Sequence, residues 1–237
     1  MSILDELENF RMEQEAAQQY FFGYLSLQLI PSSNPEVLAK LNDTPGFWIT
    51  ARYALLLSAF VALGRIFDQD RRSIHNIDKL LGAVSTNMSL FTRSALQQRR
   101  ISDGMPPSAA AKYASDKHDL TIADYRAMRK AVAEWRRVYE DRYRDVRHLV
   151  FAHRGIPRSQ IDTLMSKTTI DEMQQILGFL HSLQVSLDEL YRNGRKPNLE
   201  PRVFCLPPDK SRSSDTAGER VYRESMSLQY DMLPSQQ

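Results

Sequence analysis

The sequence predicts an all-helical protein, built as a bundle of five to six helices joined by loops. Apolar residues recur every three to four positions along most of the chain, which is the period of an amphipathic helix. The sequence shows no internal repeat and no convincing pair of alternating strands. With 237 residues, 42% hydrophobic and 25% charged, the composition is that of an ordinary globular protein. Helices without strands bury their apolar faces against one another, which gives a bundle.

The first half of the chain predicts two long helices. Residues 3–30 carry the helical apolar period, and Pro31 is expected to end that helix. Thr44 and Pro45 suit the N-cap and first turn of the next helix, which we expect over 47–67 as the central helix. Gly64 is the one weak helix former in it.

The longest apolar run, Tyr53–Leu63, lies inside this central helix between two arginines. It is about half of the roughly twenty residues needed to cross a bilayer. We therefore expect a buried core helix and no membrane partner.

Two shorter helices follow, at 73–84 and 89–101, and residues 102–120 contain Gly104, Pro106 and Pro107. That composition predicts a loop between two halves of the domain, with room for a short helical turn.

The second half predicts one long helix from Thr121 to about Ala152 and a last helix over 169–193. Thr169 with Glu172 opens this last helix, its apolar period marks one buried face, and Gly194 closes it. Thr121 with Asp124 is a capping-box signature. The apolar stripe that follows includes Tyr125, Trp135 and Tyr139, so these aromatic residues, like Trp48, are expected in the core and not as stacking platforms for bases.

Beyond Arg195 the apolar period disappears, and Pro, Ser, Asp, Arg and Gln dominate. We expect an all-helical domain at 1–195 and a polar, loosely ordered C-terminal tail at 196–237. The sequence does not decide whether part of that tail forms a short docking helix, for which the apolar residues would be Val221, Tyr222, Met226 and Leu228.

Charge and cysteine content restrict the protein's surroundings. The net charge of +2 does not by itself indicate a nucleic-acid-binding protein. The single Cys205 forms no disulfide within the chain, and an acidic, interrupted N-terminus is unlike a secretory signal. These features predict a cytoplasmic protein.

The helix from Thr121 and the turn after it have an uneven charge. Over 121–158 ten basic residues face five acidic ones, a local balance of +5. Such a surface suits phosphate groups. The alternative is an ordinary solvated face on which Glu140 or Asp141 pairs with Arg144 at helical spacing. The ten basic residues are Arg126, Arg129, Lys130, Arg136, Arg137, Arg142, Arg144, Arg147, Arg154 and Arg158.

At the end of this helix stands Arg147-His148-Leu149-Val150-Phe151-Ala152-His153. This R-x5-H arrangement resembles the active-site motif of HEPN-type ribonucleases, an arginine, a polar residue and then a histidine. The wider layout is similar to that of AbiU-like abortive-infection proteins, whose upstream apolar helix also ends in an Arg-x-x-Asp-like segment, here Arg65-Ile66-Phe67-Asp68. Gly155 departs from the pattern, since such sequences often carry an aspartate there.

The resemblance implies a HEPN-like helical bundle that cleaves RNA without a metal or any other cofactor. Arg147, His148 and His153 would be the catalytic residues, and Arg137, Arg144 and Arg154 would bind RNA. His153 would exchange protons near neutral pH. Arg147 would hold the phosphate, and His148 would orient the RNA or the other motif residues. Single-stranded RNA is favoured because in-line attack by a 2′-hydroxyl needs a free backbone.

The resemblance also implies partners. Six residues of regular α-helix rotate about 240°, which leaves Arg147 and His153 on different faces. HEPN domains pair as dimers with their motifs facing each other, so we expect a homodimer with the motif at the interface. A role in phage defence or in a toxin–antitoxin system, with an antitoxin or regulatory partner, rests on this analogy.

The alternative interpretation is a non-catalytic module of the same helical fold, which binds RNA, a nucleotide or another protein. Other enzymatic classes lack their motifs, since the chain has no Gly-rich phosphate loop, GxSxG, HExxH or Glu-x-x-His pair. Asp68, Asp70 and Asp78 have no regular ligand spacing, so we expect caps and surface carboxylates, and no metal site.

Overall fold

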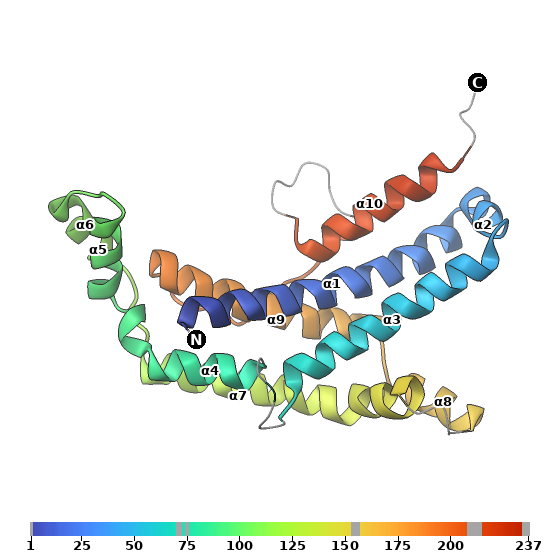
Figure 1. Cartoon of the computed structure of the whole chain (residues 1–237), viewed down its shortest axis with the longest axis horizontal. Coiled ribbons are helices and arrows are strands. Elements are labelled where there is room, and N and C mark those ends of the chain that lie inside the picture. Colours follow the sequence, from blue (N-terminus) through green and yellow to red (C-terminus); the bar gives the residue numbers. More distant parts are fainter. Residues whose placement is uncertain (1, 70–72, 74–75, 153–156, 208–214, 234–237) are drawn as a thin grey trace.

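The computed structural model describes residues 2–69, 73, 76–152, 157–207 and 215–233. Over these ranges the chain is all-α, with no strand (Figure 1). In chain order the elements are α1 (Ile3–Ser33), α2 (Pro35–Leu41), α3 (Pro45–Phe67), α4 (Ile77–Thr86), the 3₁₀ turn η1 (Met88–Phe91), α5 (Arg93–Ser102), α6 (Pro107–Ala114), α7 (Ile122–Val138), the π-helical segments η2 (Tyr139–Tyr143) and η3 (Val146–Ala152), α8 (Arg158–Met165), α9 (Ile170–Asn193) and α10 (Ala217–Asp231).

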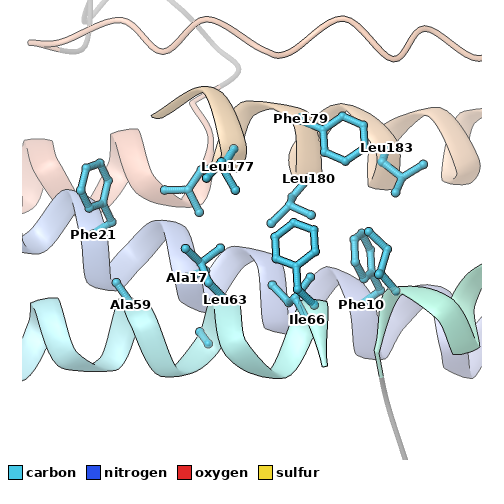
Figure 2. Packing of buried hydrophobic residues seen from close by; sticks show 14 of the residues in the cluster. Phe10, Ala17, Phe21, Ala59, Leu63, Ile66, Leu177, Phe179, Leu180 and Leu183 are labelled. Atoms are coloured by element: carbon cyan, nitrogen blue, oxygen red, sulfur yellow. The ribbon is translucent and has the colours of Figure 1, made fainter. Parts of the chain in front are cut away.

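The core forms around α1, which lies between α3, α9 and α10 (Figure 1). Because neighbours cover it on several sides, α1 buries residues around most of its circumference instead of along one stripe. Figure 2 shows Phe10 and Phe21 of α1 among Leu63 of α3 and Leu177 and Leu180 of α9. All five are at most 5% exposed.

The helix count exceeds the five to six expected, because segments read as loops form short helices. Residues 107–114 of the expected loop are α6, which packs on α5 at one end of the bundle (Figure 1). α2 and α8 likewise each occupy less than three turns. Such short helices carry too few apolar positions for their period to be visible in the sequence.

Pro31 does not end α1, which continues to Ser33. The backbone N–H of Asn34 still bonds to the carbonyl of Ile30 at 3.0 Å, and Ile30 and Pro31 are buried. The helix ends three residues later than predicted because tertiary packing holds the turn around the proline.

α3 is a core helix only in its second half, which corrects the expectation for Tyr53–Leu63. Its buried residues begin at Ala59, whereas Phe47 and Ile49 are 64% and 59% exposed. By length and composition α3 is also long enough and apolar enough to cross a membrane, and 22% of its apolar window is buried inside the structure. Core helices of soluble proteins have the same length and composition.

The caps at the ends of the later helices form as the sequence predicts. Thr121 and Asp124 make the reciprocal capping box at the start of α7. Thr169 caps α9, and Gly194 ends it with a φ of 63°, a left-handed conformation that glycine adopts readily.

Residues 217–231 differ from the loosely ordered tail that the composition predicts. They form α10, which begins with a capping box made by Thr216 and Glu219 and packs along α1. Tyr222 is buried, and Ser225 lies 2.6 Å from Ser26. The docking helix left open by the sequence is therefore present and belongs to the same bundle.

Candidate functional site

The long helix that carries the motif does not keep one winding. After α7 the chain is π-helical in η2 and again in η3, with Arg144 and Asp145 between them. π-helical turns use i→i+5 hydrogen bonds and occur often at functional sites. The region therefore differs from the single regular α-helix expected over 121–152.

Ring contacts hold this segment along α3. Tyr139 stacks on Phe67 with ring centroids 5.2 Å apart and an angle of 21°. Tyr143 lies 5.7 Å from Phe60, and Phe151 lies 5.2 Å from the same ring. Arg147 therefore projects from a segment that is fixed against α3 both before and after it.

Arg147 crosses α3 at Gly64. A Cβ atom placed on Gly64 would lie 2.5 Å from Cζ and 2.6 Å from Cδ of Arg147. Carbon atoms in contact normally stay about 3.5–4.0 Å apart. The absent side chain of Gly64 is thus what lets the arginine lie flat against the helix backbone.

The arginine enters a polar pocket of about 270 Å³ between the end of α3 and the π-helical segments. From the motif segment the pocket takes Arg144, Arg147 and His148. From elsewhere it is lined by Gly64, Phe67, Asp68, Gln69, Tyr139 and Glu140. The two segments of the sequence that resemble the HEPN pattern, the motif and the end of the upstream helix, thus meet in one place.

The guanidinium groups in this pocket form no ion pair with carboxylates of the described residues, although Asp68 and Glu140 line the same pocket. Neither Arg144 nor Arg147 has an ion pair within 4.0 Å in that part of the chain, and the pairs of Arg144 with Glu140 or Asp141 are not formed. Charges elsewhere on the same helix do pair, as Arg136 does with Asp78 at 2.8 Å and Arg142 with Glu172. The motif end is therefore where positive charge is left available to an anion.

Tyr139 supplies a buried hydroxyl to the pocket. The residue is 3% exposed, and none of the described residues accepts a hydrogen bond from its Oη. Burial raises the pKa of this hydroxyl, and the nearby guanidinium of Arg147 opposes the rise only in part. At neutral pH the group therefore keeps its proton and is a hydrogen-bond donor.

The structure brings together three of the six residues predicted for the site. Arg144, Arg147 and His148 line the pocket. Arg137, in contrast, is exposed on α7 and is not among the lining residues. His153 and Arg154 lie outside the described residues.

The predicted difficulty in aligning Arg147 with His153 depended on regular α-helical winding. Val146–Ala152 is π-helical, so the rotation of about 240° for six α-helical residues does not describe this segment. The expectation of a dimer therefore cannot rest on this rotation and needs support from other features of the structure.

Sequence reasoning missed four lining residues of this pocket, namely Gly64, Gln69, Tyr139 and Glu140. Gly64 did carry a signal, because it is the one weak helix former in an otherwise strongly apolar helix. Tyr139 was correctly placed in the core by its ring, but the period of a helix does not show where a hydroxyl group points.

No group of three His, Cys, Asp or Glu side chains in the described ranges is arranged to hold a metal ion. Asp78 is used in the ion pair with Arg136, and Asp68 lines the arginine pocket, while Asp70 lies outside those ranges. Trp48 and Trp135 are partly buried and pack on the core, Trp135 stacking on Phe179 at 5.7 Å.

Comparison with known proteins places the chain in a family. The model of the family HEPN_AbiU2, described as AbiU2, matches residues 3–221. No curated protein and no solved structure matched the chain. The match includes α1 to α9, the arginine pocket and the first turn of α10. The chain belongs to the AbiU2 family of HEPN-domain proteins.

Proposed function

We propose that this protein is a metal-independent endoribonuclease of the HEPN type, which cleaves single-stranded RNA in the cytoplasm during phage defence or as part of a toxin–antitoxin system. One observation carries the proposal. Arg144 and Arg147 line a polar pocket beside His148 and form no ion pair with a described carboxylate. Guanidinium groups without an ion pair in a concave site suit the phosphates of RNA.

The reaction needs one group that moves protons and one that stabilises charge. The 2′-hydroxyl of a ribose attacks the adjacent phosphorus, its proton passes to a base, and the bond from phosphorus to the 5′-oxygen of the next nucleotide breaks. A proton returned to that oxygen completes the step and leaves a 2′,3′-cyclic phosphate. His153 is the proposed base or acid. Arg147 stabilises the charge that builds on the phosphate oxygens.

A second copy of the chain is the proposed partner at this site. Ile49 and Tyr53, one turn apart, leave an apolar face on the first half of α3, with exposures of 59% and 44%. The face continues toward the motif, since the ring of Tyr53 lies 5.6 Å from that of Phe151 in η3. A dimer across this face would cover apolar surface that is otherwise exposed to water and would place the two motif segments near each other.

The test is incubation of the purified protein with mixed RNA in the presence of a chelator. Wild type, Arg147→Ala and His153→Ala are compared, with helix content checked by circular dichroism. We expect cleavage by wild type and its loss in both variants. If wild type does not cleave, or if all three cleave equally, the assignment as a ribonuclease is wrong. Binding of RNA without cleavage would identify a non-catalytic RNA-binding module of the same fold.

A further inference from the structure

The pocket beside Arg147 holds more than the groups that the proposed reaction uses. Tyr139 and Glu140 lie in η2, more than one turn before the motif, and Asp68 and Gln69 follow the end of α3. The reaction as written assigns no role to any of them. They form the walls of the same 270 Å³ space into which both arginines project.

The hydroxyl of Tyr139 is the feature that points to a ligand. It is buried at the side of this space with the guanidinium of Arg147 as its charged neighbour, and no described residue accepts its proton. A buried hydroxyl whose proton has no acceptor is unfavourable, so most such groups in proteins donate a hydrogen bond. A guanidinium group only donates hydrogen bonds. Arg147 therefore cannot accept the proton of this hydroxyl, whereas an anionic oxygen held between the two groups can.

The lining as a whole suits a nucleotide better than a bare anion. Arg144, Arg147 and Tyr139 offer donors, which suit a phosphate, while Asp68 and Glu140 are carboxylates that would repel it. Those carboxylates accept hydrogen bonds from the hydroxyls of a ribose or from the N–H groups of a base. The volume is near the lower end of ordinary ligand sites, which fits one nucleotide with the rest of the strand outside.

We propose that this pocket is a subsite for one nucleotide of the RNA, whose phosphate is held by Arg144, Arg147 and the hydroxyl of Tyr139. This assignment rests on the proposed function, because that function identifies the nucleotide as part of an RNA. Gly64 contributes to the same subsite, because Arg147 reaches the pocket across the backbone of Gly64. Tyr139 is a binding residue in this account, and its hydroxyl is needed for RNA affinity but not for folding.

The chain offers a matched pair of variants. Tyr139 and Tyr143 are both at most 3% exposed, and each packs on a phenylalanine of α3. Tyr143 differs because its hydroxyl bonds to the carbonyl of Thr169 at 3.4 Å and it lines a different, more apolar pocket. Replacing either by phenylalanine removes one oxygen atom and keeps the ring.

The experiment measures binding of a fluorescein-labelled single-stranded RNA with 2′-O-methyl riboses, which cannot be cleaved through a 2′-hydroxyl. Fluorescence anisotropy is recorded for wild type, Tyr139→Phe and Tyr143→Phe, together with each melting temperature. We expect Tyr139→Phe to bind about tenfold more weakly, as for loss of a hydrogen bond to a charged group, with a melting temperature equal to or above that of wild type. Tyr143→Phe should bind RNA as wild type does.

A second arm separates this subsite from the proposed reaction. Titrations with 5′-nucleoside monophosphates and with inorganic phosphate, followed by calorimetry, report on the pocket without any strand. Binding of the nucleotide that is stronger than that of phosphate and is weakened in Tyr139→Phe supports the subsite, even if the protein fails to cleave RNA.

The subsite is overturned if Tyr139→Phe binds RNA as tightly as wild type, whether or not the protein is a ribonuclease. It is also overturned if wild type binds neither the RNA nor a nucleotide. Equal weakening by Tyr139→Phe and Tyr143→Phe, with a lower melting temperature for both, would make Tyr139 an ordinary core residue.

Discussion

Arg147 lies across the backbone of Gly64, so that its guanidinium enters the polar pocket only because α3 has no side chain at that position. This relationship joins a residue of the motif to one 83 positions earlier in the chain. It also provides a way to displace the arginine without changing it.

Gly64→Ala should lower RNA cleavage strongly while the protein stays folded. The added methyl group would overlap Cζ and Cδ of Arg147, so the arginine side chain must shift from its place in the pocket. Alanine is a better helix former than glycine by about 1 kcal/mol, which offsets part of the steric cost. We expect kcat/KM for RNA to fall at least about tenfold, as for a displaced transition-state contact.

Gly82→Ala is the control, because an added Cβ at Gly82 meets nothing within 4 Å and the residue is also within a helix. It should leave cleavage unchanged and raise the melting temperature slightly. Full activity in Gly64→Ala would show that the position of Arg147 over the α3 backbone is not required.

Arg144→Ala and Arg137→Ala should have different effects on RNA affinity. Arg144 lines the pocket, whereas Arg137 is exposed on α7 and does not. Loss of one phosphate contact should reduce the slope of log affinity against log salt by about 0.7 for a single strand. We expect that change for Arg144→Ala and a smaller one for Arg137→Ala, measured by anisotropy between 50 and 200 mM salt. Equal slopes for the two variants would contradict the assignment of the pocket as the phosphate site.

Ile49→Asp should dissociate the proposed dimer without unfolding the chain. Ile49 is 59% exposed on α3, so a carboxylate there is solvated in the monomer and buried only in a dimer across this face. Light scattering should show a dimer for wild type and a monomer for the variant. Leu4→Asp, at a 44% exposed position on α1, is the control. A monomeric wild type, or a variant that remains dimeric, would rule out this interface, and wild type that binds lipid vesicles through the face would assign it to a membrane.

His181 should make stability depend on pH between 7.5 and 5.5. Burial lowers the pKa of His181 from 6.5, and the charge of Arg202 lowers it further, although Glu219 and Glu15 oppose this. Between the lowered value and 6.5 the unfolded chain binds more protons, so stability is lost as pH falls through 6.5. The pKa of Glu219 is lowered from 4.5, so its own loss of stability falls below that range.

The measurement is the urea midpoint of wild type and of His181→Gln at several pH values in this range. We expect the midpoint of wild type to fall more on acidification than that of the variant. Parallel curves would mean that His181 is not the group responsible.

The features that could be predicted from the sequence are those set by neighbours along the chain. The Thr121–Asp124 capping box and the left-handed Gly194 depend on residues within one turn, and both are formed as expected. The spacing of the apolar residues in α9 also identified the face of that helix that is buried. A helix end such as Pro31 could not be placed in this way, because the turn around the proline is held by packing against other helices.

The site could be predicted in part, for the same reason. Arg144, Arg147 and His148 follow one another closely, so their common location needed only the motif. The opposite wall comes from the end of α3, and the π-helical winding that presents Arg147 to it has no signature in the apolar period. Glu140 and Asp141 stand at helical spacing from Arg144, yet neither pairs with it. Spacing alone could not decide between a phosphate-binding surface and a solvated face.

The measurement that tests the central claim most directly is the chemical identity of the RNA ends left by the protein in the presence of a chelator. Mass spectrometry of a short RNA after incubation with wild type should show fragments ending in a 2′,3′-cyclic phosphate, and Arg147→Ala should produce none. Fragments ending in a 3′-hydroxyl, or an RNA left intact by wild type, would contradict the proposal that Arg147 serves metal-independent attack by the 2′-hydroxyl.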